Sequence, residues 1–251
     1  MEHELGLTAL FNDYLAGLGS AILGLFRIHP ENAARPWENW LVMEILVIAL
    51  LMITVAVLRS SLSVEKPGTL QHLFESIYGF IKGTIEQVGI HHGEQYAPYI
   101  ATMFITILSF NLIGVVPAFE SPTMVPYVPA GLAIITFVYF NAMGFRANGI
   151  GYLGHFAGPV RFPNKVATAA IVIFMVPIET ISVFIRPLSL TVRLFGNIFA
   201  GDQVTLVFLQ LTKLVFPVIF MGLHVFVSFV QAYVFMLLTT IYISGAVAHE
   251  H

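Results

Sequence analysis

One arginine, Arg193, lies inside the longest apolar region of this 251-residue chain. A guanidinium stays protonated at every physiological pH. At mid-bilayer depth it costs roughly 3 kcal/mol on insertion scales and on the order of 10 kcal/mol in simulations. A charge in such a segment needs a function to justify it, so Arg193 is the first candidate functional residue.

Further polar side chains share the helical face of Arg193. Steps of three or four residues place side chains on one side of a helix. The stripe consists of Glu179, Ser182, Arg186, Ser189, Arg193 and Asn197. Its ends lie about 27 Å apart at the rise of an α-helix, which is close to the ~30 Å hydrocarbon thickness of a bilayer. The sequence therefore predicts a polar path across a membrane, with a permanent cation in its second half.

The position of the cation favours two aqueous wells rather than one open pore. Positive potential at the middle of the path repels a free proton. A proton must therefore be transferred there to a carrier, and a mobile carboxylate would serve. A membrane potential of about 100 mV contributes ~2.3 kcal/mol to each such transfer.

A second polar stripe lies in the last apolar segment, at His224, Ser228 and Gln231. Asp202 follows Arg193 by nine residues, which is about 180° around a helix, so it faces a different neighbour. Asp202 and His224 are each costly alone in lipid, and together they can share a proton or a hydrogen bond. We therefore expect them to pair across a helical hairpin, either as part of a proton path or as a structural tie.

Several members of the stripes also have structural interpretations. Serine hydroxyls in membrane helices often bond to their own backbone, which applies to Ser182, Ser189 and Ser228. Arg186 can extend toward an interface or pair with Glu179, seven residues earlier. Within its own helix Arg193 has no acid on the same face closer than Glu179, about 21 Å along the axis, so we expect its partner to lie outside this helix.

Composition limits the class of protein that carries these residues. The chain is 57% hydrophobic and only 10% charged, against about 25% charged in soluble domains. Net charge is −3, so no basic field indicates a nucleic-acid partner, and the absence of cysteine excludes disulfides and thiolate metal sites. No phosphate loop, metal motif or nucleophile elbow appears, so neither cofactor nor metal is expected. We expect an integral, all-α, polytopic membrane protein.

Five membrane segments and one surface helix are expected to position the polar stripes. The spans are approximately residues 40–58, 99–116, 127–145, 166–211 and 214–245. The last two are too long for one perpendicular crossing, so we expect two long, tilted helices in a hairpin. Residues 69–89 have apolar side chains on one helical face and polar side chains on the opposite face, which is typical of an amphipathic helix lying on a membrane.

The apolar segments indicate the domain organisation, and the basic residues indicate the orientation in the membrane. Residues 1–37 form an N-terminal outer-face segment with a possible interfacial helix, and residues 38–251 form the membrane domain. Basic residues cluster in 59–96 and 146–165 and are absent from 117–126. The positive-inside rule then places the N-terminus outside and the C-terminus in the cytoplasm. The acidic start, Met1-Glu2-His3-Glu4, is unlike a cleaved secretory signal.

The run Pro187-Leu-Ser-Leu-Thr-Val-Arg193-Leu-Phe-Gly-Asn197-Ile-Phe-Ala-Gly-Asp202 resembles the a subunit of F-type ATP synthases. This subunit is the membrane stator that faces the rotating ring of c subunits. Gln231-Ala232 and the segment 111–117 are similar to two further signatures of the family. The resemblance covers about residues 40–244. It implies a proton-conducting subunit with no catalytic site of its own, in a bacterial inner membrane.

The resemblance also implies roles for single residues. Arg193 would face the ionisable carboxylate of each c subunit and separate two offset half-channels. The outer half-channel would be lined by Asn111, Asn197, Asp202, His224, Ser228 and Gln231. The inner half-channel would be lined by Glu179, Ser182, Arg186 and Ser189. Gly114 departs from the family, because some members carry an acid there. The implied partners are the c ring, the b subunit of the peripheral stalk, other ATP synthase subunits, the lipid bilayer and protons.

Two other classes of protein could also carry some of these residues. A secondary transporter could bind an anionic substrate at Arg193, but it should show two homologous halves, and the Arg193 stripe is not repeated. An intramembrane enzyme could use Asp202 and His224 as a catalytic pair, but the chain offers no convincing nucleophile or metal set.

Overall fold

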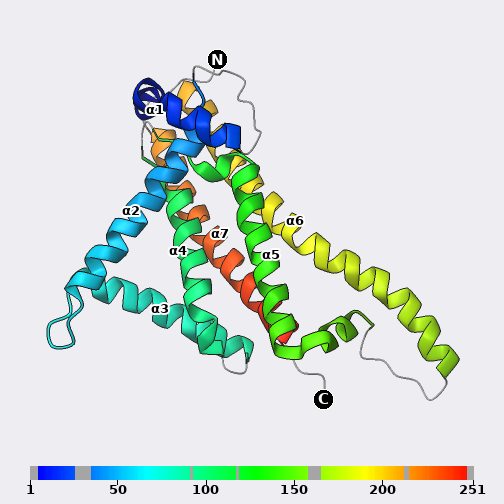
Figure 1. The fold of residues 1–251 in the computed structure, drawn as a ribbon. Helices are drawn as coiled ribbons and strands as arrows, with labels where there is room; N and C mark the ends of the chain where they lie inside the picture. Colours follow the sequence, from blue (N-terminus) through cyan, green and yellow to red (C-terminus); the bar gives the residue numbers. More distant parts are fainter. Residues whose placement is uncertain are drawn as a thin grey trace. The chain divides into compact units, whose positions relative to one another are not determined.

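The structure is a computed structural model that describes residues 5–25, 35–90, 93–116, 119–157, 165–211 and 215–247. Over these ranges the chain is all-helical, as expected (Figure 1). Its α-helices are α1 (Gly6–Leu25), α2 (Asn39–Ser61), α3 (Thr69–Val88), α4 (Ala97–Ile113), α5 (Tyr127–Asn148), α6 (Lys165–Leu211) and α7 (Val215–Val247). Short 3₁₀-helices are η1 (Gly93–Gln95), η2 (Pro122–Met124) and η3 (Gly149–Ala157).

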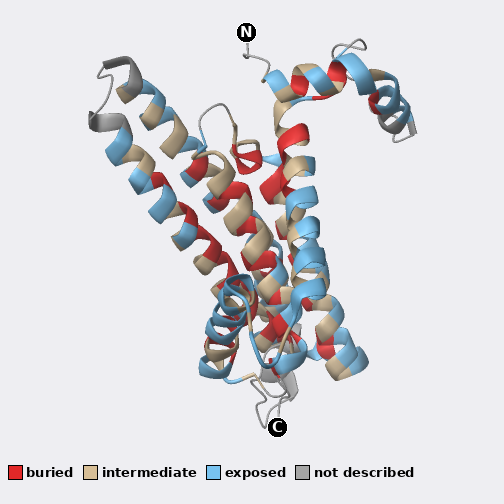
Figure 2. Cartoon of the chain, turned by 90° about the vertical axis from the view of Figure 1, so that its left-hand side faces the viewer, coloured by how far each residue is buried: buried red, intermediate tan, exposed pale blue. Residues whose placement is uncertain are grey.

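Four helices in the described ranges are long and apolar enough to cross a membrane, namely α2, α5, α6 and α7. Helix α4 is also apolar, but it has 17 residues. Long stretches of the helices are exposed (Figure 2). Many of their exposed side chains are large and apolar, such as Met52 and Ile53 on α2. An outward apolar surface on so many long helices suits lipid rather than water. The five-span arrangement with a surface helix at α3 stays a prediction.

Helix α6 runs unbroken through two prolines, Pro177 and Pro187. Each proline removes one backbone N–H from the helical ladder. Helices that cross membranes tolerate this because leaving the helical state would free many more polar groups. The uninterrupted 47-residue helix carries the whole predicted polar stripe, so the spacing argument from Glu179 to Asn197 applies to a single element.

The segment that follows α5 is helical and packs back on α5. Helix α5 ends at Gly149, whose φ of 56° is left-handed, and the 3₁₀-helix η3 follows it. The Tyr152 ring packs on Gly144, and its hydroxyl donates to Asn141 Oδ1 at 3.0 Å. These contacts hold the chain against α5, and a sequence pattern does not display them. Residues 158–164 lie outside the described ranges.

The chain packs as two compact units. The first comprises residues Met1–Gly68, Thr106–Val125 and Gly196–Phe229. In it, the Asn12 side chain bonds to both the N–H and the carbonyl of Trp37, while Trp37 Nε1 donates to the carbonyl of Leu15 at 2.9 Å. These bonds join α1 to the residues that lead into α2.

The second unit comprises residues Thr69–Ile105, Pro126–Phe195 and Val230–His251. Its helices are joined by ring contacts between Tyr99 and Tyr139 and between Phe140 and Tyr242. In addition, Asn148 Nδ2 donates to the carbonyl of Ala246 at 3.1 Å, which ties the end of α5 to the end of α7.

Candidate functional site

Arg193 is exposed on α6. Buried residues Leu190 and Leu194 occupy a different face of the same helix. Among the described residues no carboxylate forms an ion pair with Arg193, and Glu179, the acid on its face, pairs with Arg186 instead. The side chain is therefore available to a group from another molecule.

Asp202 and His224 form the pair that the sequence predicted between the last two helices. Asp202 Oδ1 lies 3.3 Å from His224 Nδ1, and their side chains are 19% and 7% exposed. Gly201, next to Asp202, lies beside the same ring, because an added Cβ would stand in ordinary contact with Nδ1 at 3.5 Å. The other ring nitrogen, Nε2, is buried without a hydrogen-bond partner among the described residues. The pair thus has one satisfied end and one end open to a further proton donor or acceptor.

Ser228 is fully buried one turn after His224. Its hydroxyl donates to the carbonyl of His224 at 2.7 Å. This is the backbone bond expected of a serine in a membrane helix. It supports the structural interpretation of Ser228 and also fixes the turn that presents the imidazole.

Asn111 is fully buried on α4 and joins a chain of hydroxyl groups. Thr123 Oγ1 donates to Asn111 Oδ1 at 2.7 Å, and Thr123 Oγ1 lies 2.7 Å from Ser121 Oγ. Asn111 Nδ2 has no partner among the described residues. A buried amide donor without a partner calls for an ordered water or another ligand.

Three of the four predicted inner residues line one open hollow of about 550 Å³. Its polar lining is Ser182, Arg186, Ser189 and Tyr242. Arg186 Nη2 lies 3.4 Å from Glu179 Oε1, and its guanidinium carbon lies 5.0 Å from the centre of the Tyr242 ring. The structural pairing of Glu179 with Arg186 is therefore formed, and Tyr242 adds a cation–π contact to it.

The two remaining predicted residues differ in burial. Asn197 is exposed on α6 one turn after Arg193, while Gln231 on α7 is 6% exposed. Among the described residues no group of histidines and carboxylates could hold a metal ion. His91 and His92 lie outside the described ranges.

Sequence reasoning missed Tyr242, Thr123 and Ser121. Tyr242 follows Gln231 by eleven residues, which is about 20° around the helix. The helical spacing of the second stripe therefore extends to Tyr242. Ser121 and Thr123 lie in a short, proline-containing segment. No periodicity marks such residues, and only the folded loop brings them to Asn111.

The family model and the relatives that match this chain all belong to one protein family. A family model described as ATP synthase A chain matches residues 40–244. The chain is 54% identical over 243 residues to ATP synthase subunit a of Solibacter usitatus, covering 96% of this chain and 100% of that protein. It is 45% identical over 252 residues to ATP synthase subunit a of Koribacter versatilis, covering 100% of both. It is 38% identical over 206 residues to ATP synthase subunit a 3 of Pelobacter propionicus, covering 82% and 86%.

Proposed function

The chain belongs to the ATP synthase A chain family, and from that premise we propose how it moves protons. Membership makes it the proton-translocating subunit of the membrane sector and an integral, multi-pass membrane protein whose partners are other ATP synthase subunits. We propose that protons travel through two offset aqueous half-channels, separated by Arg193, to and from the carboxylates of a c-subunit ring. The b subunit of the peripheral stalk would hold this chain as a stator.

The state of Arg193 is the observation that carries this proposal. The guanidinium is exposed and has no ion-pair partner among the described residues. A permanent cation in an apolar helix needs an anion. A carboxylate carried past Arg193 by a rotating partner supplies that anion and leaves again. While the carboxylate is beside Arg193, the guanidinium keeps it ionised. The guanidinium also repels protons that would leak between the half-channels.

The outer half-channel would deliver protons through the buried pair of Asp202 and His224. His224 Nε2, buried without a partner in the described part of the chain, is the end of the pair that can pass a proton onward. Lining residues would be Asn111, Asn197, Ser228 and Gln231. Ser228 would act by holding the backbone turn of His224.

The inner half-channel would use the hollow beside Arg186. Ser182 and Ser189 provide hydroxyl groups there, and Glu179 neutralises part of the Arg186 charge. With the N-terminus outside and the C-terminus in the cytoplasm, this hollow lies on the cytoplasmic side of Arg193. The proposed location is a bacterial inner membrane.

Replacing Arg193 tests the proposal. Arg193→Ala in the complete ATP synthase should assemble but lose ATP-driven proton pumping, measured with a pH-sensitive dye in inverted vesicles. Arg59→Ala is the matched control, because Arg59 is exposed in the last turn of α2 and off the polar stripe. Normal coupled pumping by Arg193→Ala would refute the proposed role.

A further inference from the structure

Asn111 ends a short chain of buried polar groups whose hydrogen atoms can be counted. Ser121 Oγ lies 2.8 Å from the carbonyl oxygen of Phe110 and 2.7 Å from Thr123 Oγ1. Thr123 Oγ1 in turn lies 2.7 Å from Asn111 Oδ1. Asn111, Ser121 and Thr123 are at most 1% exposed. Each of the three contacts therefore needs a hydrogen atom that the polar chain itself supplies.

With Oδ1 of Asn111 toward Thr123, the polar chain is one hydrogen atom short. The carbonyl oxygen of Phe110 and Oδ1 of Asn111 only accept, and each hydroxyl group has one hydrogen atom. Two hydrogen atoms then serve three contacts, so one pair of oxygen atoms has no hydrogen atom between them. At the other end of the carboxamide, Asn111 Nδ2 is buried without a partner among the described residues. The donor that the contacts lack is therefore unused on the same side chain.

A half-turn of the Asn111 carboxamide removes this mismatch. The oxygen and the nitrogen of a carboxamide are nearly equal in size, so the hydrogen bonds that each can make decide which end occupies which place. After the half-turn, Nδ2 donates to Thr123 Oγ1. Thr123 then donates to Ser121 Oγ, and Ser121 donates to the carbonyl of Phe110. Every contact now contains one hydrogen atom, and the buried end without a partner is the carboxamide oxygen.

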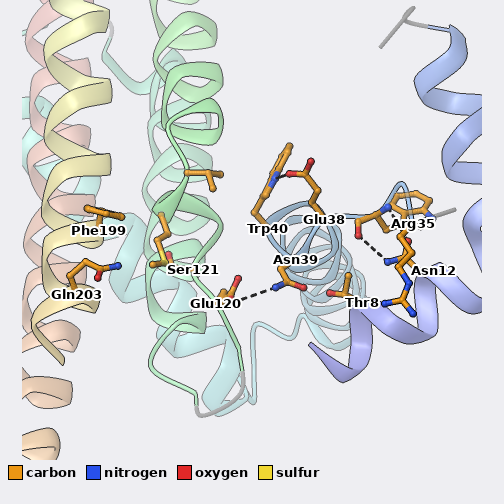
Figure 3. Close-up of a pocket in the computed structure, with 13 residues that line it drawn as sticks. Thr8, Asn12, Arg35, Glu38, Asn39, Trp40, Glu120, Ser121, Phe199 and Gln203 are labelled. Atoms are coloured by element: carbon orange, nitrogen blue, oxygen red, sulfur yellow. Dashed lines mark hydrogen bonds between the residues drawn. The ribbon is translucent and has the colours of Figure 1, made fainter. Parts of the chain in front are cut away.

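The polar chain starts beside the part of α6 that carries the acidic member of the Asp202–His224 pair. Ser121 lines one pocket together with Phe199 and Gln203 of α6 (Figure 3). Gln203 directly follows Asp202 in the sequence. The first unit contains the polar chain as well as this stretch of α6. The orientation of the Asn111 carboxamide is therefore set from a segment that packs near Asp202.

We propose that Ser121 and Thr123 are positioning residues that hold Asn111 with its carboxamide oxygen toward the water of the outer half-channel. The oxygen end of a carboxamide carries partial negative charge and accepts hydrogen bonds, whereas the NH₂ end carries partial positive charge and donates them. An acceptor in this place binds a water molecule through one of its hydrogen atoms and favours the protonated form of that water. The NH₂ end would repel the excess proton.

Asn111 itself neither gains nor loses a proton in this arrangement. Ser121 and Thr123 act only through the orientation of its side chain, and the proton stays with the water molecules of the path. This inference rests on the proposed function and adds the polarity that one lining residue of the outer half-channel must present.

The test removes the Thr123 hydroxyl in two backgrounds of the complete ATP synthase. Thr123→Val deletes the group that accepts from Nδ2, so the carboxamide loses its preferred orientation. One hydrogen bond is equivalent to roughly fivefold to tenfold in such a preference, and ATP-driven proton pumping in inverted vesicles should fall by that factor. Asn111→Asp has an oxygen at either end of the side chain, so orientation no longer matters. In the Asn111→Asp background, Thr123→Val should therefore change pumping by less than about twofold.

Two further variants separate positioning from general damage. Thr123→Ser keeps a hydroxyl group and should restore most of the pumping that Thr123→Val loses. Thr102→Val is the matched control on α4, because the Thr102 hydroxyl donates to the carbonyl of Pro98 in its own helix. Pumping is expressed per assembled complex, and Thr123→Ala repeats the comparison with a smaller side chain.

The outcomes separate this inference from the proposed function. An equal fold-loss from Thr123→Val in both backgrounds would give Thr123 a structural role alone. An inactive Asn111→Asp variant would show that the path needs the NH₂ end, and unchanged pumping by Thr123→Val would show that orientation has no effect. Each of these results, or an equal loss in Thr102→Val, overturns the positioning role. Failure of the proposed function appears separately, as normal pumping by Arg193→Ala.

Discussion

Asp202 on α6 and His224 on α7 place a carboxylate oxygen 3.3 Å from an imidazole nitrogen, with both side chains largely buried. Each group would be costly alone in an apolar environment, and together each lowers that cost for the other. The pair joins the two long helices within one unit and leaves His224 Nε2 open.

Removing one member of this pair should impair both proton conduction and local stability. His224→Ala leaves the Asp202 carboxylate buried without its partner, and a positioned proton-transfer group contributes on the order of a hundredfold or more to rate. We expect a loss of that order in ATP synthesis by the reconstituted complex. Thr205→Val, which removes only a hydroxyl bonded to the carbonyl of Gly201 in its own helix, should retain most activity. Equal losses in both variants would contradict a role for the pair in conduction.

Tyr242 should matter through the face of its ring rather than its hydroxyl. Tyr242→Phe keeps the cation–π contact with Arg186, whereas Tyr242→Leu removes it at a cost of about 0.5–2 kcal/mol. We expect Tyr242→Leu to lower the thermal unfolding temperature and slow proton transfer at the inner side, with Tyr242→Phe close to wild type. Identical behaviour of the two variants would show that the contact does not position Arg186.

Gly114 should resist even the smallest side chain. A Cβ at this position would lie 2.9 Å from the Ser121 Cβ and 3.1 Å from its backbone nitrogen. The Ser121 backbone cannot yield as a flexible side chain would, so Gly114→Ala should destabilise by about 1–3 kcal/mol. Gly131→Ala is the control, because nothing lies within 4 Å of the added atom. The free energy of unfolding is measured by denaturant titration of the purified subunit in detergent. Equal values for the two variants would contradict the packing argument.

The ion pair between Lys82 on α3 and Glu94 should be sensitive to acid. Lys82 Nζ lies 2.6 Å from Glu94 Oε1, and this hydrogen bond lowers the pKa of Glu94 and raises the pKa of Lys82. The carboxylate contribution is complete above the ordinary glutamate pKa and is lost as pH falls through the lowered value. The ammonium contribution is lost only as pH rises through the raised lysine pKa.

Glu94→Gln should therefore lower the unfolding temperature near neutral pH but not in strong acid. Glu65→Gln serves as the control, since Glu65 is an exposed carboxylate between α2 and α3. A difference between wild type and Glu94→Gln that persists unchanged in strong acid would contradict the assignment.

Much of the fold follows from patterns in the sequence, because length and apolar periodicity decide helices in lipid. The range 69–89 contains the helix α3, and the long apolar segment 166–211 lies within the helix α6. The position of α3 on the membrane surface stays a prediction. The Asp202–His224 pair was also predictable, since two costly groups on neighbouring helices need each other. The burial of Asn111 beside Ser121 and Thr123 could not be predicted, because these two residues lie in a loop without periodicity. The half-channel roles themselves stay proposals.

The two prolines of α6 have a mechanical consequence. Without their N–H groups, the carbonyls of Ile173 and Val183 each lose a helical partner, so bending is easiest at these two points. They lie about 15 Å apart along the axis and bracket Glu179 and Ser182. The segment between these two points can change its angle relative to the helix on either side. On the proposed function, a sideways load from the rotor would be taken up first as bending at these two points, which lie before the segment that carries Arg193.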